Sequence, residues 1–134
     1  SARNQIQAEV LTIDSHDVNA KIGLKLKGGQ VLNVVITQEA VGNLHLEVGE
    51  TVTAIFKSSA VVPHVGEKQS KGNILEGLIS KIEKDEKNIK VLIDIGSHDK
   101  IVSVISKKSL ESIVLSEGKT IQVQINSHDI MLGK

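Results

Sequence analysis

Apolar and polar residues alternate along most of this chain. Ile6, Ala8 and Val10 are separated by polar residues, and the same alternation runs through 20–26 and 52–56. Branched residues repeated with a period of two are typical of half-buried antiparallel strands. The first half is therefore expected to hold strands near 6–10, 18–26, 31–37 and 51–57, followed by a short fifth strand.

Turn and cap signals separate these strands. Gly28-Gly29 predicts a hairpin between the second and third strands, because glycine adopts positive φ without steric cost. Thr37 precedes Gln-Glu-Ala and predicts the N-cap of a short helix that runs to about Leu44. The order expected is three strands, one short helix and two strands.

The second half of the chain repeats the first. A shift of 69 positions (70 − 1 = 69) places residues 70–134 over residues 1–65 without a gap. Many of the remaining pairs exchange one aliphatic residue for another. The eleven identical pairs are Ser1/Ser70, Asn4/Asn73, Ile13/Ile82, Asn19/Asn88, Lys21/Lys90, Val35/Val104, Ile36/Ile105, Leu46/Leu115, Gly49/Gly118, Thr51/Thr120 and Ser58/Ser127. The repeat predicts the same elements in the second copy, at 74–83, 87–95, 100–106, 107–113 (the helix), 119–126 and 129–132.

The repeat also predicts the domain organisation. We expect a first module at 1–66, a linker at 67–69 and a second module at 70–134, each an all-β, OB-like small barrel with one short helix. A module near 60 residues buries only about 60% of its unfolded surface and is marginal alone. The two copies are therefore expected to pack together, and the pair to form a homo-oligomer.

Composition excludes several classes of function. The 134 residues carry 16 basic and 16 acidic side chains, so no net field recruits nucleic acid or an acidic membrane. Aromatic residues make up 1% of the chain, which removes the stacking surface used for single-stranded nucleic acid. Cysteine is absent, and no apolar run approaches the ~20 residues of a membrane helix. A soluble, cytoplasmic protein is expected.

Two segments carry the candidate chemistry. Ser1-Ala2-Arg3-Asn4 opens the first strand, and Lys57-Ser58-Ser59-Ala60 closes the fourth, so their ends are expected to meet within one module or across a subunit contact. Together they offer a guanidinium, an ammonium, hydroxyls and amides, with no carboxylate. Such donors suit a fully ionised tetrahedral dianion, whose oxygens only accept hydrogen bonds. The competing interpretation is a solvated N-terminus beside a strand-end lysine.

Catalysis and metal ligation have weaker support. Ser-His-Asp occurs at 15–17, 97–99 and 127–129. Consecutive residues of an extended chain point to opposite faces, so a tripeptide does not form a hydrolase triad. These segments are expected to be hairpin turns. The five histidines lack the spacing of metal ligands. The protein is therefore not expected to be an enzyme.

A family resemblance strengthens the oxyanion interpretation. The segments SARNQ at the start, VNA at 18–20, VVITQEA at 34–40 and LEVGETVTAIFKSS at 46–59 resemble the Mop (molbindin) domain, which is related to the TOBE domain. The resemblance covers the whole first copy, and the second copy resembles a degenerate Mop domain. The chain thus resembles tandem di-Mop proteins, which bind molybdate or tungstate.

The resemblance also implies site residues. In Mop oligomers the oxyanion lies between subunits. The resemblance therefore implies that one chain contributes Ser1, Ala2, Arg3 and Asn4, and that another chain contributes Thr37, Ala40, Lys57 and Ser58. The oligomer is expected to be a dimer or a trimer. Val18, Asn19 and Ala20 match a second class of oxyanion site found on a symmetry axis in some Mop oligomers. In the second copy Gly72 replaces Arg3 and Asn126 replaces Lys57. That copy is expected to act mainly as scaffold.

These residues and this resemblance predict that the protein binds molybdate or tungstate for intracellular molybdenum storage and homeostasis. No organic cofactor is expected, and no membrane or nucleic-acid partner is expected. The alternative is the C-terminal molybdate-sensing half of a transcription regulator. A nucleic-acid-binding OB module, the third possibility, is opposed by the zero net charge and the single aromatic residue.

Overall fold

The computed structural model describes residues 3–64, 72–110 and 113–134. In the first copy, the strands are β1 (Arg3–His16), β2 (Asn19–Leu26), β3 (Val31–Thr37), β4 (Thr51–Lys57) and β5 (Val62–Pro63). Helix α1 (Gln38–Leu44) follows β3, and a 3-10 turn, η1 (Ser58–Ala60), follows β4. The Thr37 hydroxyl accepts a 3.1 Å hydrogen bond from the Ala40 amide, as expected of an N-cap.

The second copy has the same order of strands. They are β6 (Gly72–Lys84), β7 (Asn88–Gly96), β8 (Asp99–Ser106), β9 (Thr120–Asn126) and β10 (Met131–Gly133). Two 3-10 turns, η2 (Lys107–Leu110) and η3 (Ser127–Asp129), stand where the first copy has α1 and η1. The helix expected at 107–113 is thus a 3-10 turn that ends at Leu110, and residues 111–112 lie outside the described part.

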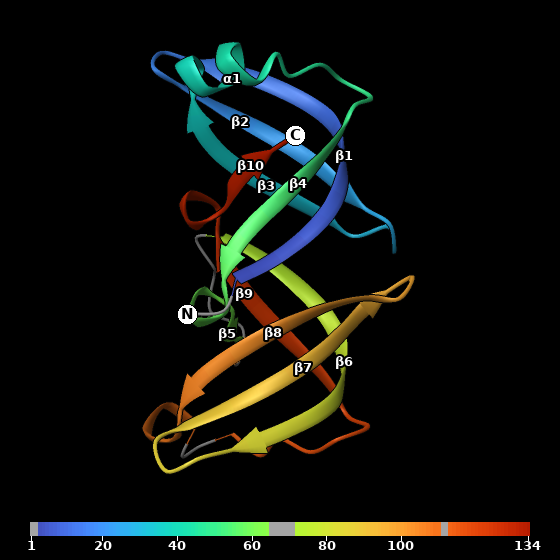
Figure 1. The fold of residues 1–134 in the computed structure, drawn as a ribbon, viewed down its shortest axis with the longest axis vertical. Helices are drawn as coiled ribbons and strands as arrows, with labels where there is room; N and C mark the ends of the chain where they lie inside the picture. Colours follow the sequence, from blue (N-terminus) through green and yellow to red (C-terminus); the bar gives the residue numbers. More distant parts are fainter. Residues whose placement is uncertain (1–2, 65–71, 111–112) are drawn as a thin grey trace.

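The two copies exchange their last strands. The first sheet has the order β10-β4-β1-β2-β3, and the second has the order β5-β9-β6-β7-β8, with antiparallel pairing throughout. Each five-stranded sheet is therefore completed by the short final strand of the other copy. Figure 1 shows the result, two curled sheets stacked along the long axis with β10 rising into the upper one. The expectation that the copies pack together is confirmed.

Two buried asparagines join the copies around a pseudo-twofold axis. The Asn4 side chain donates to the Val102 carbonyl (2.9 Å) and accepts from the Val102 amide (2.8 Å). Asn73 makes the matching pair with the Asn33 carbonyl (2.9 Å) and amide (2.6 Å). The shift of 69 relates both partners (4 + 69 = 73; 33 + 69 = 102). An asparagine amide can mimic a peptide group in this way, because it carries both a donor and an acceptor.

The apolar residues of the alternating pattern form the core. Inward positions of β1 and β4 are buried, and the single aromatic side chain, Phe56, is 1% exposed. Val61 and Ile130 lead into the exchanged strands and are also buried. Burial of a large apolar side chain contributes about 1.5–3 kcal/mol, so these two residues help to hold the exchanged ends in place.

The all-β fold class with two small OB-like modules is confirmed, as are the hairpin at Gly28-Gly29 and the helix after Thr37. Gly29 has φ of +98°, the conformation for which glycine was expected. The proposed module boundaries fall within residues 65–71, outside the described part, and they stay a prediction.

Candidate functional site

Two cations lie side by side where β1 begins and β4 ends. Arg3 and Lys57 are directly opposite in the antiparallel register of these strands. Their neighbours Asn4 and Phe56 are buried, so the alternation of the strands turns both cationic side chains outward, and both are exposed. Like charges placed directly opposite each other destabilise a sheet, and a bound anion would offset this repulsion.

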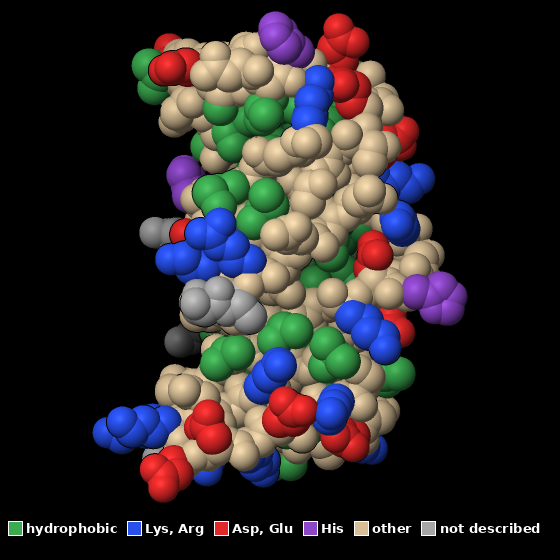
Figure 2. Space-filling model, viewed as in Figure 1, with side chains coloured by type: hydrophobic (Ala, Val, Ile, Leu, Met, Phe, Trp, Pro, Cys, Tyr) green, Lys and Arg blue, Asp and Glu red, His purple; other side chains and the backbone are tan. Residues whose placement is uncertain are grey.

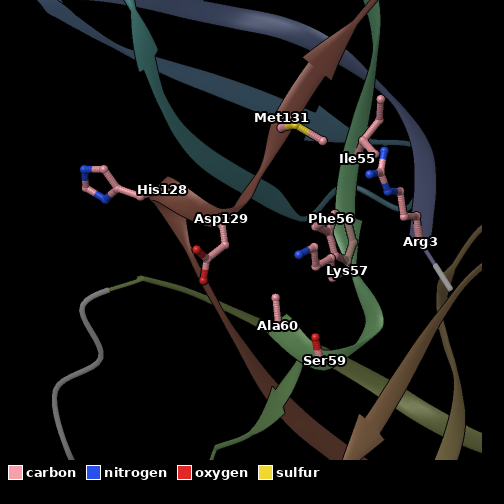
Figure 3. Close-up of a pocket in the computed structure, with 9 residues that line it drawn as sticks. All are labelled: Arg3, Ile55, Phe56, Lys57, Ser59, Ala60, His128, Asp129 and Met131. Atoms are coloured by element: carbon pink, nitrogen blue, oxygen red, sulfur yellow. The ribbon is translucent and has the colours of Figure 1, made fainter. Parts of the chain in front are cut away.

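The pair borders a pocket of about 360 Å³. Its walls come from β1, β4, η1, η3 and β10, so both copies contribute to it. The lining residues are Arg3, Ile55, Phe56, Lys57, Ser59, Ala60, His128, Asp129 and Met131. In Figure 3 the Lys57 ammonium points across the pocket toward the side that holds His128 and Asp129, with Ala60 and Ser59 along the lower edge.

Among residues 3–64, 72–110 and 113–134, the cations of the pocket have no acidic partner within ion-pair distance. In the described part of the chain, the salt bridges join Lys81 to Glu83, Lys90 to Glu83 and Lys134 to Glu50. None involves Arg3 or Lys57. Figure 2 shows basic side chains gathered near the middle of the long axis, with an acidic one beside them. The arrangement leaves cationic donors open to a small anion.

Three pocket residues were not expected from the sequence. His128, Asp129 and Met131 belong to the second copy and reach the pocket because β10 pairs with β4. Asp129 corrects the expectation of a constellation without a carboxylate. The shift of 69 aligns these residues with Ser59, Ala60 and Val62, but an alignment of the copies carries no sign that their last strands are exchanged.

The remaining residues of the N-terminal segment differ in their placement. Ser1 and Ala2 lie outside the described residues. Both polar atoms of the Asn4 side chain are bonded to Val102, so this side chain is committed to the junction between the copies. Ser58 begins η1 and is 2% exposed, while its neighbour Ser59 lines the pocket.

Thr37 and Ala40 lie at the other end of the first module. They form the start of α1, at the top of Figure 1, whereas Arg3 and Lys57 lie near the waist of the molecule. The structure thus brings Arg3 and Lys57 together within one chain, and whether they face each other across a subunit contact, as the resemblance implies, stays a prediction. Thr37 and Ala40 can contact the same anion only if a second chain supplies them.

Val18, Asn19 and Ala20 lie beside the start of α1. Val18 is 75% exposed, and its carbonyl accepts a 2.8 Å hydrogen bond from the Gln38 amide. The Asn19 carbonyl accepts from the Gln38 side chain at 3.2 Å, and Ala20 is buried. Val18 therefore lies exposed in the β1–β2 turn, whereas Asn19 and Ala20 begin β2, and none of the three side chains is basic.

The second copy lacks the cations at the equivalent place. Gly72 and Asn126 are opposite each other in the β6–β9 register, as Arg3 and Lys57 are in the β1–β4 register. The Asn126 side chain accepts a 2.9 Å hydrogen bond from the His128 amide. The local geometry of the repeat is kept while its charge is lost.

The Ser-His-Asp segments are turns. Asp17 has φ of +54° in the β1–β2 hairpin, and Ser97 has φ of +50° in the β7–β8 hairpin. The third segment forms η3 instead of a hairpin, because β10 crosses to the other copy. Among the described residues, no cluster of three or more His, Asp or Glu side chains could hold a metal ion. No helix in the described ranges is long and apolar enough to cross a membrane.

Comparison with known proteins identifies the family. The TOBE domain matches residues 1–63 and again residues 69–132. This chain belongs to the TOBE domain family. The resemblance to tandem Mop proteins is confirmed, and the family and fold are those of binding proteins.

Among curated relatives, MopB of Rhodobacter capsulatus, a molybdenum-pterin-binding protein, is 29% identical over 98% of this chain and 50% of its own length. The molybdenum transport protein ModE of Herbaspirillum seropedicae is 25% identical over 98% of this chain and 50% of its own. The chain thus spans about half the length of these relatives. A probable molybdenum-pterin-binding protein of Haemophilus influenzae is 40% identical over 46% of the chain and 90% of its own length.

The fold is also that of a solved structure. The cytoplasmic molybdate-binding protein ModG, in a crystal form with molybdate bound, superimposes with a TM-score of 0.91 and 29% identity. The match covers 99% of this chain and 96% of that one.

Proposed function

We propose that this chain binds molybdate in the pocket bordered by Arg3 and Lys57. The observation that carries the proposal is the placement of these two cations opposite each other, without an ion-pair partner among the described residues, in a fold shared with molybdate-bound ModG. The names of the Mop relatives support the same ligand class.

The chemistry of the pocket fits a tetrahedral dianion. Arg3 supplies a planar fork of donors and Lys57 a compact charge, and hydrogen bonds to charged groups contribute about 1.5–3 kcal/mol each. Tungstate has the same charge and nearly the same size, so we expect it to bind as well. The ligand is the oxyanion itself, with no organic cofactor.

A second chain is needed to complete the site. Small-molecule sites usually bury most of the ligand surface, whereas Arg3 and Lys57 are exposed in one chain. We propose a homo-oligomer, dimer or trimer, in which Thr37 and Ala40 of a neighbour cover the anion. Ser1 and Ala2 are proposed to contribute through their position next to Arg3.

We infer that the protein stores or buffers molybdate in the cytoplasm. The likeness to ModG over 96% of that chain favours a binding protein over the sensing half of a regulator. Val18, Asn19 and Ala20 are proposed as a second oxyanion site on a symmetry axis, where the turns of neighbouring chains would meet.

Isothermal titration tests the proposed function. The wild-type chain, Arg3→Ala and Lys57→Ala are titrated with molybdate, tungstate, sulfate and phosphate, with Lys21→Ala on the outer face of β2 as the matched control. We expect micromolar or tighter binding of the first two anions and at least a tenfold loss in either pocket variant, equivalent to about 1.4 kcal/mol. Equal binding of sulfate, or an Arg3→Ala variant that binds like Lys21→Ala, would refute the proposal.

A further inference from the structure

The pocket contains one negative charge that a dianion site does not require. Asp129 lies in η3 of the second copy and faces the pocket with Lys57, Ser59 and Ala60. It is exposed, and no hydrogen bond or ion pair of its carboxylate occurs among the described residues. The matching position of the first copy is Ala60 (60 + 69 = 129), so the second copy brings a carboxylate where the repeat alone would place a methyl group.

A carboxylate at this position has an electrostatic consequence. It repels a fully ionised dianion, because each of the two charges of the anion interacts unfavourably with it. Opposite charges at Arg3 and Lys57 outweigh this repulsion, so the anion still binds but is held less tightly. A hydrogen-bearing oxyanion, such as hydrogen phosphate, can instead donate its proton to the carboxylate.

We propose that Asp129 is a specificity-determining residue that weakens the hold of this pocket on fully ionised dianions and so allows their release. The proposal rests on the proposed function, because it concerns the same anion site. It assigns a role to the second copy: through the exchange of β10 with β5, that copy contributes a charge that sets the affinity of the first copy's site.

The expected magnitude follows from Coulomb's law in a water-like surrounding. For an assumed separation of about 7 Å in water, a unit charge changes the binding constant of a dianion about sevenfold without salt, about fivefold at 0.01 M salt and about threefold at 0.1 M. Salt screens the interaction, since the Debye length is about 10 Å at 0.1 M ionic strength. A second chain that covers the pocket lowers the local dielectric constant and enlarges the effect.

The test compares Asp129→Asn, Asp129→Glu and the control Asp14→Asn, which removes the same charge at the far end of β1. In titrations with molybdate at low salt, Asp129→Asn is expected to bind about fivefold more tightly than wild type, and this gain is expected to shrink at higher salt. Asp129→Glu and Asp14→Asn are expected to bind with wild-type affinity. Phosphate affinity is expected to rise less, because the variant loses an acceptor together with the repulsion. Thermal unfolding should stay unchanged, since the carboxylate has no bond within the described structure.

The outcomes separate this inference from the proposed function. Suppose that wild type binds molybdate and Arg3→Ala does not. If Asp129→Asn then binds molybdate as tightly as wild type or more weakly, the role proposed for Asp129 is wrong and the proposed function stands. If Asp14→Asn tightens binding as much as Asp129→Asn, the effect is one of net charge and the inference also fails. If wild type binds no molybdate, both fail.

Discussion

Replacing Asn73 with alanine is expected to destabilise the junction between the two copies. The side chain is 6% exposed and makes three hydrogen bonds, to the Asn33 amide (2.6 Å), the Asn33 carbonyl (2.9 Å) and the Ile125 carbonyl (3.2 Å). Alanine leaves all three backbone groups without this partner. An unsatisfied buried group costs about 1–3 kcal/mol, and water reaches the partly buried Asn33 groups, so we expect a total loss of about 2–4 kcal/mol.

That loss is a large part of the 5–15 kcal/mol typical of a folded domain. Equilibrium unfolding in urea, followed by circular dichroism, measures it. Asn43→Ala, at an exposed position of α1, is the matched control and is expected to change the free energy of unfolding by only a few tenths of a kcal/mol. Asn4→Ala removes two hydrogen bonds in place of three and should cost less than Asn73→Ala.

The isosteric variant Asn73→Asp sharpens the test. It keeps the acceptor for the Asn33 amide but places a carboxylate oxygen against two carbonyl oxygens, so it should be at least as unstable as Asn73→Ala at neutral pH. If both variants lower the free energy of unfolding by less than about 1 kcal/mol, this expectation is wrong. The three hydrogen bonds of Asn73 would then contribute no more than one hydrogen bond at the surface.

Three further predictions follow from single positions. Gly72→Ala should lower the free energy of unfolding in urea by about 1–3 kcal/mol, because an added Cβ would come within 2.5 Å of the Ile125 carbonyl oxygen. A variant as stable as wild type would contradict this prediction. Asp99→Ala should raise the free energy of unfolding by about 1 kcal/mol, because alanine removes a buried carboxylate oxygen that lacks a partner among the described residues; a lower free energy of unfolding would show that the carboxylate is needed. The Lys134 ammonium lowers the pKa of Glu50, so this pair stabilises the fold above the ordinary glutamate pKa and ceases to do so as the pH falls through the lowered value. Glu50→Gln should therefore melt below wild type at neutral pH, and the difference should vanish in strong acid.

Local chemistry made most of the fold predictable. Alternation located the strands, and Gly29 and Thr37 located the hairpin and the helix, because each signal acts through the backbone of its own neighbours. Exchange of the last strands was not predictable in this way. Either copy offers the same partner edge to a short apolar strand, and the choice between β4 and β9 depends on tertiary packing.

The candidate site was predictable in part for the same reason. Arg3 and Lys57 were expected together because they end adjacent strands, and the β1–β4 register places them opposite each other. Asn4 was grouped with them by sequence, whereas its side chain joins the copies. Asp129 was missed because its approach depends on the strand exchange.

The central claim is that Arg3 and Lys57 of one chain hold the oxyanion. A crystal structure of the protein grown with molybdate, with the anomalous signal of molybdenum recorded, tests this most directly. The account predicts an anomalous peak within hydrogen-bond distance of both cationic head groups, and loss of the peak in Arg3→Ala. A peak confined to Val18–Ala20, or no peak beside the two cations, would contradict it.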